Sequence, residues 1–166
     1  NMRATRPTCP PRWIAPRSIS SAHAASAFYC SPFEEAACLT VDGFGDFLSS
    51  LSAVGRGSRL EVLDELMFPH SLGILYTAIT QFLGFPAYGD EYKVMGLAPY
   101  GEPRFVKAIK DHLIDIREDG SLWMNMECFT YPYGLTMTGT ALERVLGGPP
   151  RQPESRLTQR EMDLAR

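Results

Sequence analysis

Several short segments of the chain carry side chains that could do chemistry. His23 lies in a run of small residues, and Asp42 and Gly43 follow it at the end of an apolar segment. A neutral imidazole is a common metal ligand. An acidic residue that ends a strand before Gly-x-Gly could hold a metal or a water where the backbone approaches a phosphate. Because Asp-Gly is also the commonest hairpin-turn signal, its spacing alone favours a turn over a ligand site.

The other candidate residues also have structural interpretations. A lone histidine is more often packed or solvent-facing than a metal ligand. The helical partner that His23 would need is absent, since Ile19 and Ala27 stand four residues away on either side. Lys93 could meet a phosphate as a point charge, but without further context a solvated surface lysine is favoured. His70, at a predicted helix start, could bind a substrate hydroxyl or cap a turn, and both interpretations stay open.

The hydrophobic pattern predicts both strands and helices around these residues. The expected helices cover residues 20–28, 72–83, 90–97, 105–113, 138–147 and 158–166, with Ser71 and Thr158 as expected N-caps and Gly84 as an expected stop. The expected strands are a buried strand at 36–41, a hairpin over 45–68 that turns at 55–58, and a second hairpin over 114–126. Because a hairpin adjoins a glycine loop, we expect an α/β fold with a mixed sheet and flanking helices.

The composition is that of a globular protein with one domain. The 166 residues are 45% hydrophobic and 21% charged, which is enough to form a core. The net charge of −3 argues against nucleic acid or an anionic membrane surface as the main partner. No apolar run reaches the length of a membrane span. The four cysteines lack zinc-type spacing, which predicts free thiols in a reducing, cytoplasmic environment.

Some of these segments together resemble one protein family. They are, in chain order, HAASAFYCSPFEEAACLTVDGFGDF, FPHSLGILYTAITQFLGF, DEYKVMGLAPYGEPRF and GPPRQPESRLTQREMDLAR. Their sequence and order are similar to those of the nodulation-protein and antibiotic O-carbamoyltransferases. The resemblance covers residues 22–166.

The resemblance implies a fold and an activity. The amino-terminal domain of such enzymes is similar to the tRNA threonylcarbamoyl transferase subunit, with an actin/Hsp70-like (ribonuclease H-like) nucleotide-binding fold. A second, YrdC-like domain makes carbamoyl adenylate from carbamoyl phosphate and ATP. The amino-terminal domain then transfers the carbamoyl group to a hydroxyl of a sugar or natural-product acceptor. A divalent metal, iron in at least some members, lies in this transfer domain.

The same resemblance assigns roles to residues of this chain. His23 matches the second histidine of the family's metal motif, whereas the first falls at Ile19, which cannot bind a metal. Asp42 matches an acidic residue beside the metal and the acyl phosphate, so we expect it to be catalytic and to lie by the phosphate. Gly43 would let the backbone approach that phosphate, and Lys93 is expected among the nucleotide and phosphate contacts. A carboxylate there could orient the acceptor hydroxyl or take its proton, while a metal stabilises developing charge.

The resemblance also divides the chain. Residues 1–21 do not match and are expected to be a disordered or mistranslated segment, and residues 22–166 to be part of the amino-terminal domain, truncated at both ends. The family's third metal ligand, adenine pocket and first phosphate loop fall outside the matching segments. The isolated chain is therefore expected to be inactive without the remainder of the enzyme. The alternative is a non-catalytic nucleotide- or partner-binding module of the same fold.

Overall fold

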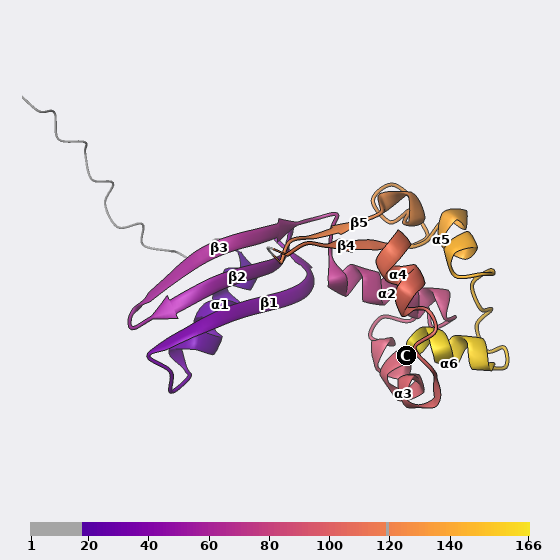
Figure 1. The fold of residues 1–166 in the computed structure, drawn as a ribbon, viewed down its shortest axis with the longest axis horizontal. Coiled ribbons are helices and arrows are strands. Elements are labelled where there is room, and N and C mark those ends of the chain that lie inside the picture. The colour runs from indigo at the N-terminus through magenta and orange to yellow at the C-terminus, as the bar shows by residue number, and fades with distance from the viewer. Residues whose placement is uncertain (1–17, 119) are drawn as a thin grey trace, which may run out of the picture.

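The structure is a computed structural model that describes residues 18–118 and 120–166. A three-stranded sheet with α1 against it forms one end of the molecule, and the other helices gather at the opposite end (Figure 1). In chain order the elements are α1 (Ile19–Tyr29), β1 (Glu35–Gly45), β2 (Leu48–Arg56), β3 (Arg59–Met67), α2 (Leu72–Phe82), α3 (Glu91–Leu97), η1 (Ala98–Tyr100), α4 (Val106–His112), β4 (Ile114–Ile116), β5 (Leu122–Met124), η2 (Met126–Cys128), α5 (Thr140–Val145) and α6 (Gln159–Ala165).

The three-stranded sheet is antiparallel and carries α1 on one face. Its strand order is β1-β2-β3, with Cys38 opposite Ala53 and Ala53 opposite Val62. Helix α1 buries Ala24 and Phe28 in the cluster that these strands form. The β4–β5 pair is antiparallel as well. The predicted hairpins and flanking helices are confirmed, but among the described residues the expected mixed sheet is replaced by antiparallel pairing, because short hairpin connections join these strands.

Strand β1 is an edge strand with one uncovered face. Leu39 is 71% exposed and Val41 52%, whereas Ala36 and Cys38 pack against the cluster beneath α1. The prediction of a fully buried strand at residues 36–41 is therefore wrong. Successive side chains of a strand point to opposite faces, so α1 covers only every second residue of β1.

The larger core lies among the helices. It contains the fully buried side chains of Phe82, Leu113, Phe129 and Leu142, which come from α2, α5 and the connecting segments. The short hairpin β4–β5 contributes Leu122 and its neighbours to the same cluster. This cluster holds the helical end together and supports the start of α2, which points toward the three-stranded sheet (Figure 1).

Three helix ends lie at the predicted residues, whereas α1 is capped by Ser18 and α5 by Gly139. The Ser71 hydroxyl accepts a hydrogen bond from the backbone N–H of Ile74 at the start of α2. Gly84, with φ of +79°, ends the same helix. The backbone N–H and hydroxyl of Thr158 both donate to the Glu161 carboxylate at the start of α6. In the part of the chain that the structure describes, no helix combines the length and apolar character that crossing a membrane requires.

Candidate functional site

The Asp42–Gly43 segment lies in a bulge of β1. The register of β1 against β2 shifts between Val41 and Gly45, so residues 42–44 stand opposite a single residue of β2. The hairpin turns at Asp46 and Phe47, which both have positive φ (54° and 64°). The interpretation of Asp42–Gly43 as the turn is therefore wrong. A bulge bends its strand and re-aims side chains, and bulges are frequent beside active sites.

The first turn of α2 lies directly against this bulge. The Ser71 hydroxyl is 3.0 Å from the carbonyl oxygen of Asp42 and 2.6 Å from that of Gly43, and it donates its proton to them. A Cβ on Gly73 would lie 2.5 Å from both the Asp42 carbonyl oxygen and the Gly43 nitrogen. Real Cβ atoms do not approach backbone so closely, so the glycine is required for this contact.

Asp42 lies in the bulge next to a glycine that has open space beside it. The residue is half-buried, and its Oδ1 accepts a hydrogen bond from the Gly43 N–H at 2.7 Å. A Cβ placed on Gly43 would meet no atom within 4 Å. The start of α2 presents the positive end of the helix dipole toward this segment, which favours negative charge there. The arrangement can therefore present a carboxylate to a ligand that approaches along Gly43.

Ile19 and His23 lie one turn apart on α1. Ile19 packs against Gly45, and a Cβ added to Gly45 would lie 3.0 Å from the Ile19 Cβ. The backbone N–H of Ile19 donates to the Asp46 carboxylate at 3.2 Å. His23 is exposed to solvent. Within residues 18–118 and 120–166, no three His, Cys, Asp or Glu side chains gather closely enough to hold a metal ion. These residues do not by themselves fit the divalent metal that the resemblance implies.

Lys93 lies on α3, away from the bulge. Its Nζ is 2.7 Å from the Asp90 carboxylate and 5.5 Å from the centre of the Phe85 ring. The hydrogen bond between the two groups lowers the pKa of Asp90 and raises the pKa of Lys93. Helix α3 packs against α2 and α6, and Figure 1 shows it apart from the three-stranded sheet. The structure therefore does not bring Lys93 next to Asp42.

His70 connects the bulge region to the β4–β5 hairpin. Its Nδ1 accepts a hydrogen bond from the Met124 N–H at 3.0 Å, and its ring lies edge-on to Trp123 at 4.7 Å. Burial lowers the pKa of His70 below its ordinary 6.5. Because Nδ1 accepts a hydrogen bond, the imidazole is neutral in this arrangement. The structure thus gives His70 a role in joining two segments, which neither sequence interpretation included.

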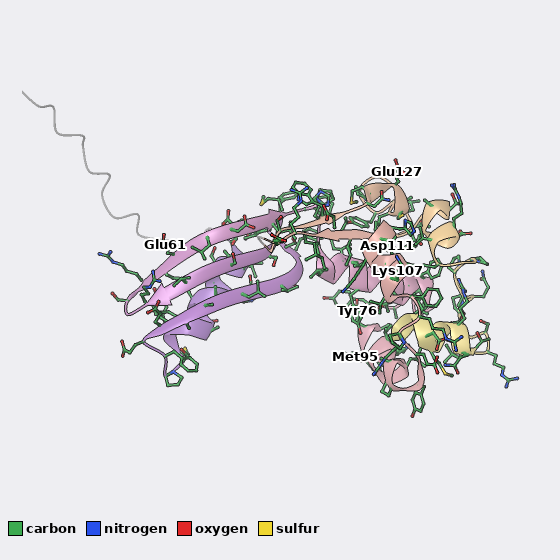
Figure 2. The ribbon with its side chains drawn as sticks, in the orientation of Figure 1. Glu61, Tyr76, Met95, Lys107, Asp111 and Glu127 are labelled. Atoms are coloured by element: carbon green, nitrogen blue, oxygen red, sulfur yellow. The ribbon has the colours of Figure 1, made fainter. Side chains whose placement is uncertain are left out.

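In the described part of the chain, two cavities lie at the helical end. One, of about 300 Å³, is lined by α4, β4 and β5 and includes Asp111. The other, of about 310 Å³, lies between α2, α3, α4 and α6 and includes Tyr76. Figure 2 labels both of these residues, well to the side of the three-stranded sheet. Neither of these two cavities is lined by His23 or Asp42.

Sequence reasoning missed the residues that hold the bulge in place. The sequence predicts Ser71 only as a helix cap, and it does not single out Gly73 or Asp46. A serine cap followed by a glycine within the first helical turn is the available signal, since glycine there lowers helix propensity without a local reason. That signal does not identify the strand that the helix meets.

Comparison with known proteins identifies a family. Residues 13–165 match the family model described as carbamoyltransferase N-terminus. The match begins before residue 22 and so includes part of the segment that was expected not to match. Residues 13–17 of that range lie outside the described part of the structure.

Several longer proteins are similar to this chain. An uncharacterized protein of Synechocystis, sll1178, is 52% identical over 143 residues, which is 86% of this chain and 23% of that protein. The nodulation protein NolNO of Sinorhizobium fredii is 44% identical over 98 residues, 59% of this chain and 14% of the relative. The nodulation protein NolO of Bradyrhizobium diazoefficiens is 39% identical over 105 residues, 63% of this chain and 19% of the relative. The chain spans less than a quarter of the length of these curated relatives.

Proposed function

Because this chain belongs to the carbamoyltransferase family through residues 13–165, we propose that it forms part of the amino-terminal domain of an O-carbamoyltransferase. The proposed donor is carbamoyl adenylate, made from carbamoyl phosphate and ATP. The proposed acceptor is a hydroxyl of a sugar or another natural product. The observation that carries the proposal is the place of Asp42 in a strand bulge. Its neighbour Gly43 has open space beside it, and the backbone carbonyl of Asp42 accepts a hydrogen bond from Ser71 at the start of α2.

The proposed reaction uses Asp42 at the acceptor. The acceptor hydroxyl oxygen attacks the carbamoyl carbon and forms a new C–O bond. The bond from that carbon to the adenylate phosphate oxygen breaks, and AMP leaves with the electron pair. Asp42 would orient the hydroxyl or take its proton. Gly43 would let the backbone approach the phosphate, since a side chain there would occupy the open space.

The proposed function needs parts beyond the described residues. Ile19 offers no donor, so a divalent metal, iron by resemblance, would need His23 together with donors from outside these residues. Carbamoyl phosphate and ATP would be handled by the remainder of the enzyme, including a YrdC-like domain. Lys93 would contact the nucleotide only after leaving its pair with Asp90. The actin/Hsp70-like fold belongs to the same proposal.

We place this activity in the cytoplasm. Cys30, Cys38 and Cys128 are free thiols among the described residues. Thiols persist where the environment is reducing, and structural disulfides are uncommon there. The isolated chain is proposed to be inactive, because the donor-forming chemistry would lie in a YrdC-like domain.

A non-catalytic nucleotide- or partner-binding module is the second candidate. The observation that favours it is the packing of Ile19 against Gly45, which joins the start of α1 to the end of β1 by an apolar contact. Such a contact stabilises the fold without any ligand. A module of this kind would keep the bulge and the α2 contact but would not transfer a carbamoyl group.

A chimera separates the two candidates. Residues 13–165 would replace the aligned segment of a full-length carbamoyltransferase whose transfer to an acceptor is measurable, once with Ile19 and once with Ile19→His. Mass spectrometry of the carbamoylated acceptor reports transfer. We expect the Ile19→His chimera to be active, and Asp42→Asn within it to lower kcat by about a hundredfold, the size of a lost acid–base contribution.

Asp64→Asn is the matched control, because Asp64 is an exposed acid on β3 of the same sheet. It should leave kcat unchanged. Full activity of the Asp42→Asn chimera would contradict the role of Asp42. A folded but inactive Ile19→His chimera would instead favour the non-catalytic module.

A further inference from the structure

We propose that Ser71 is a positioning residue for Asp42, an inference that rests on the proposed function and deepens it. The Ser71 hydroxyl lies 3.0 Å from the carbonyl oxygen of Asp42 and 2.6 Å from that of Gly43. The same oxygen accepts the Ile74 N–H at 3.0 Å, and the residue is fully buried. One hydroxyl thus joins the start of α2 to both carbonyls of the bulge.

The bulge makes this hydroxyl necessary. Where the register shifts between Val41 and Gly45, the regular ladder between β1 and β2 is interrupted. The partly buried carbonyls of Asp42 and Gly43 gain from another donor there, because an unpaired polar group shielded from water is unfavourable. Ser71 supplies that donor, and the absence of a side chain on Gly73 lets the helix come close enough for it to do so.

Ser71 is also hydrogen-bonded to β5, which packs in the core of the helical end. Its backbone N–H donates to the Sδ of Met124 at 3.1 Å. The Met124 N–H in turn donates to His70 Nδ1 at 3.0 Å. Two successive residues, His70 and Ser71, are therefore fixed on β5 before α2 begins. A group placed by rigid, hydrogen-bonded neighbours keeps its orientation, which is what a proton acceptor or hydroxyl-orienting carboxylate requires.

The first experiment uses the chain itself and does not depend on activity. NMR would compare the backbone amide signals and hydrogen exchange of Asp42 and Gly43 in the native chain and in Ser71→Ala, Ser71→Thr and Thr158→Ala. We expect Ser71→Ala to shift these signals. It should also speed exchange at Gly43 about tenfold, because a loosened bulge would open the bond from the Gly43 N–H to Asp42 Oδ1 more often. Ser71→Thr keeps the hydroxyl and should restore both.

Thr158→Ala is the matched control because it removes a helix cap at α6, which lies in the helical end. It should leave the Asp42 and Gly43 signals in place. If Ser71→Ala does not fold, Ser71→Cys keeps the volume with a weaker donor and should give the same changes to a smaller extent. Unchanged bulge signals in the folded variant, or equal changes in Thr158→Ala, would overturn the proposal.

The second experiment measures transfer in the Ile19→His chimera. Ser71→Ala should lower kcat about tenfold while KM for the acceptor stays within about twofold, because a misplaced carboxylate weakens the transition state more than substrate binding. Ser71→Thr should recover kcat, and Thr158→Ala should not change it. Undiminished kcat in Ser71→Ala would overturn the positioning role. An inactive parent chimera would instead reject the proposed function and with it the role in transfer, while the NMR result would still decide whether Ser71 fixes the bulge.

Discussion

The sheet end and the helical end of the molecule are built on unequal cores. The sheet end buries a small set of side chains, such as Phe28 and Leu51, between α1 and the sheet. The other face of the sheet leaves Leu39 and Val41 exposed. The helical end buries a larger set, in which Phe82 and Phe129 are fully enclosed. Because burial of apolar surface is the dominant favourable term in folding, we expect the helical end to be the more stable of the two.

The candidate functional residues are divided between these ends. His23 and Asp42 lie in the sheet end, and Lys93 lies in the helical end. The start of α2 connects the two, through the contacts of Ser71 and Gly73 with the bulge. The difference in core size therefore suggests that the better-packed helical end fixes the position of a carboxylate that the thinner sheet end carries.

Matched truncations in the two cores give the largest expected effects. Leu142 and Leu51 are both buried, with 0% and 1% of their surface exposed. We expect Leu142→Ala to lower the free energy of unfolding by about 4 kcal/mol and Leu51→Ala by about 2 kcal/mol, because the surroundings of Leu51 can relax toward the uncovered face. Urea denaturation followed by circular dichroism measures both. Equal losses would remove the basis for calling the cores unequal.

Much of the fold could be predicted because its signals are local. Ser71, Gly84 and Thr158 mark helix ends through their own side chains or backbone, and the structure places helix ends at these residues. The exposure of Leu39 could not be predicted in the same way. It depends on what covers each face of β1, and an apolar run alone does not distinguish a covered face from an open one.

Less of the candidate site could be predicted. The types of His23 and Asp42 suggest chemistry, but the strand bulge at Asp42 arises from the pairing of β1 with β2, which no short motif encodes. The contact between Ser71 and Asp42 joins residues far apart in the chain, so it follows from tertiary packing. The pairing of Lys93 with Asp90 is local at three residues' separation, yet its distance from the bulge depends on where α2 places α3.

A substitution at Gly73 should disrupt the contact between α2 and the bulge that joins the two ends. A Cβ on Gly73 would lie 2.5 Å from backbone atoms of the bulge, whereas one on Gly96 in α3 would meet nothing within 4 Å. Gly73→Ala should therefore lower the free energy of unfolding by about 2 kcal/mol through overpacking. Gly96→Ala, the matched helical control, should raise it by about 0.5 kcal/mol by restricting the unfolded chain. Thermal and urea unfolding test both, and a neutral Gly73→Ala would show that α2 does not press on the bulge.

The same connection should depend on pH through His70. Burial lowers the pKa of His70 below 6.5, so the folded state favours the neutral imidazole whose Nδ1 accepts the Met124 N–H. The unfolded state takes up its proton first as the pH falls. The stability contributed by this group is therefore complete above 6.5 and decreases as the pH drops from 6.5 through the lower pKa of the folded state.

His70→Gln should remove this part of the pH dependence, which is smaller than the effect of Gly73→Ala. Urea denaturation above pH 6.5 and at several pH values below it measures this dependence, with His112→Gln as the control because His112 is exposed on the surface of α4. A pH profile that His70→Gln leaves intact would assign the dependence to other groups.

Variants of Lys93 test whether the helical end contributes a side chain to the site or only holds the bulge in place. The Lys93 amine is partly exposed and paired with Asp90, so Lys93→Met should lower the melting temperature only slightly, by an amount that added salt reduces. In the active chimera we expect Lys93→Met to raise KM for ATP several-fold, and Asp90→Asn, which frees the amine, not to raise it. If both variants leave KM for ATP unchanged, Lys93 contacts no phosphate. The helical end would then act on the chemistry solely through Ser71 and Gly73, because no other predicted site residue lies within it.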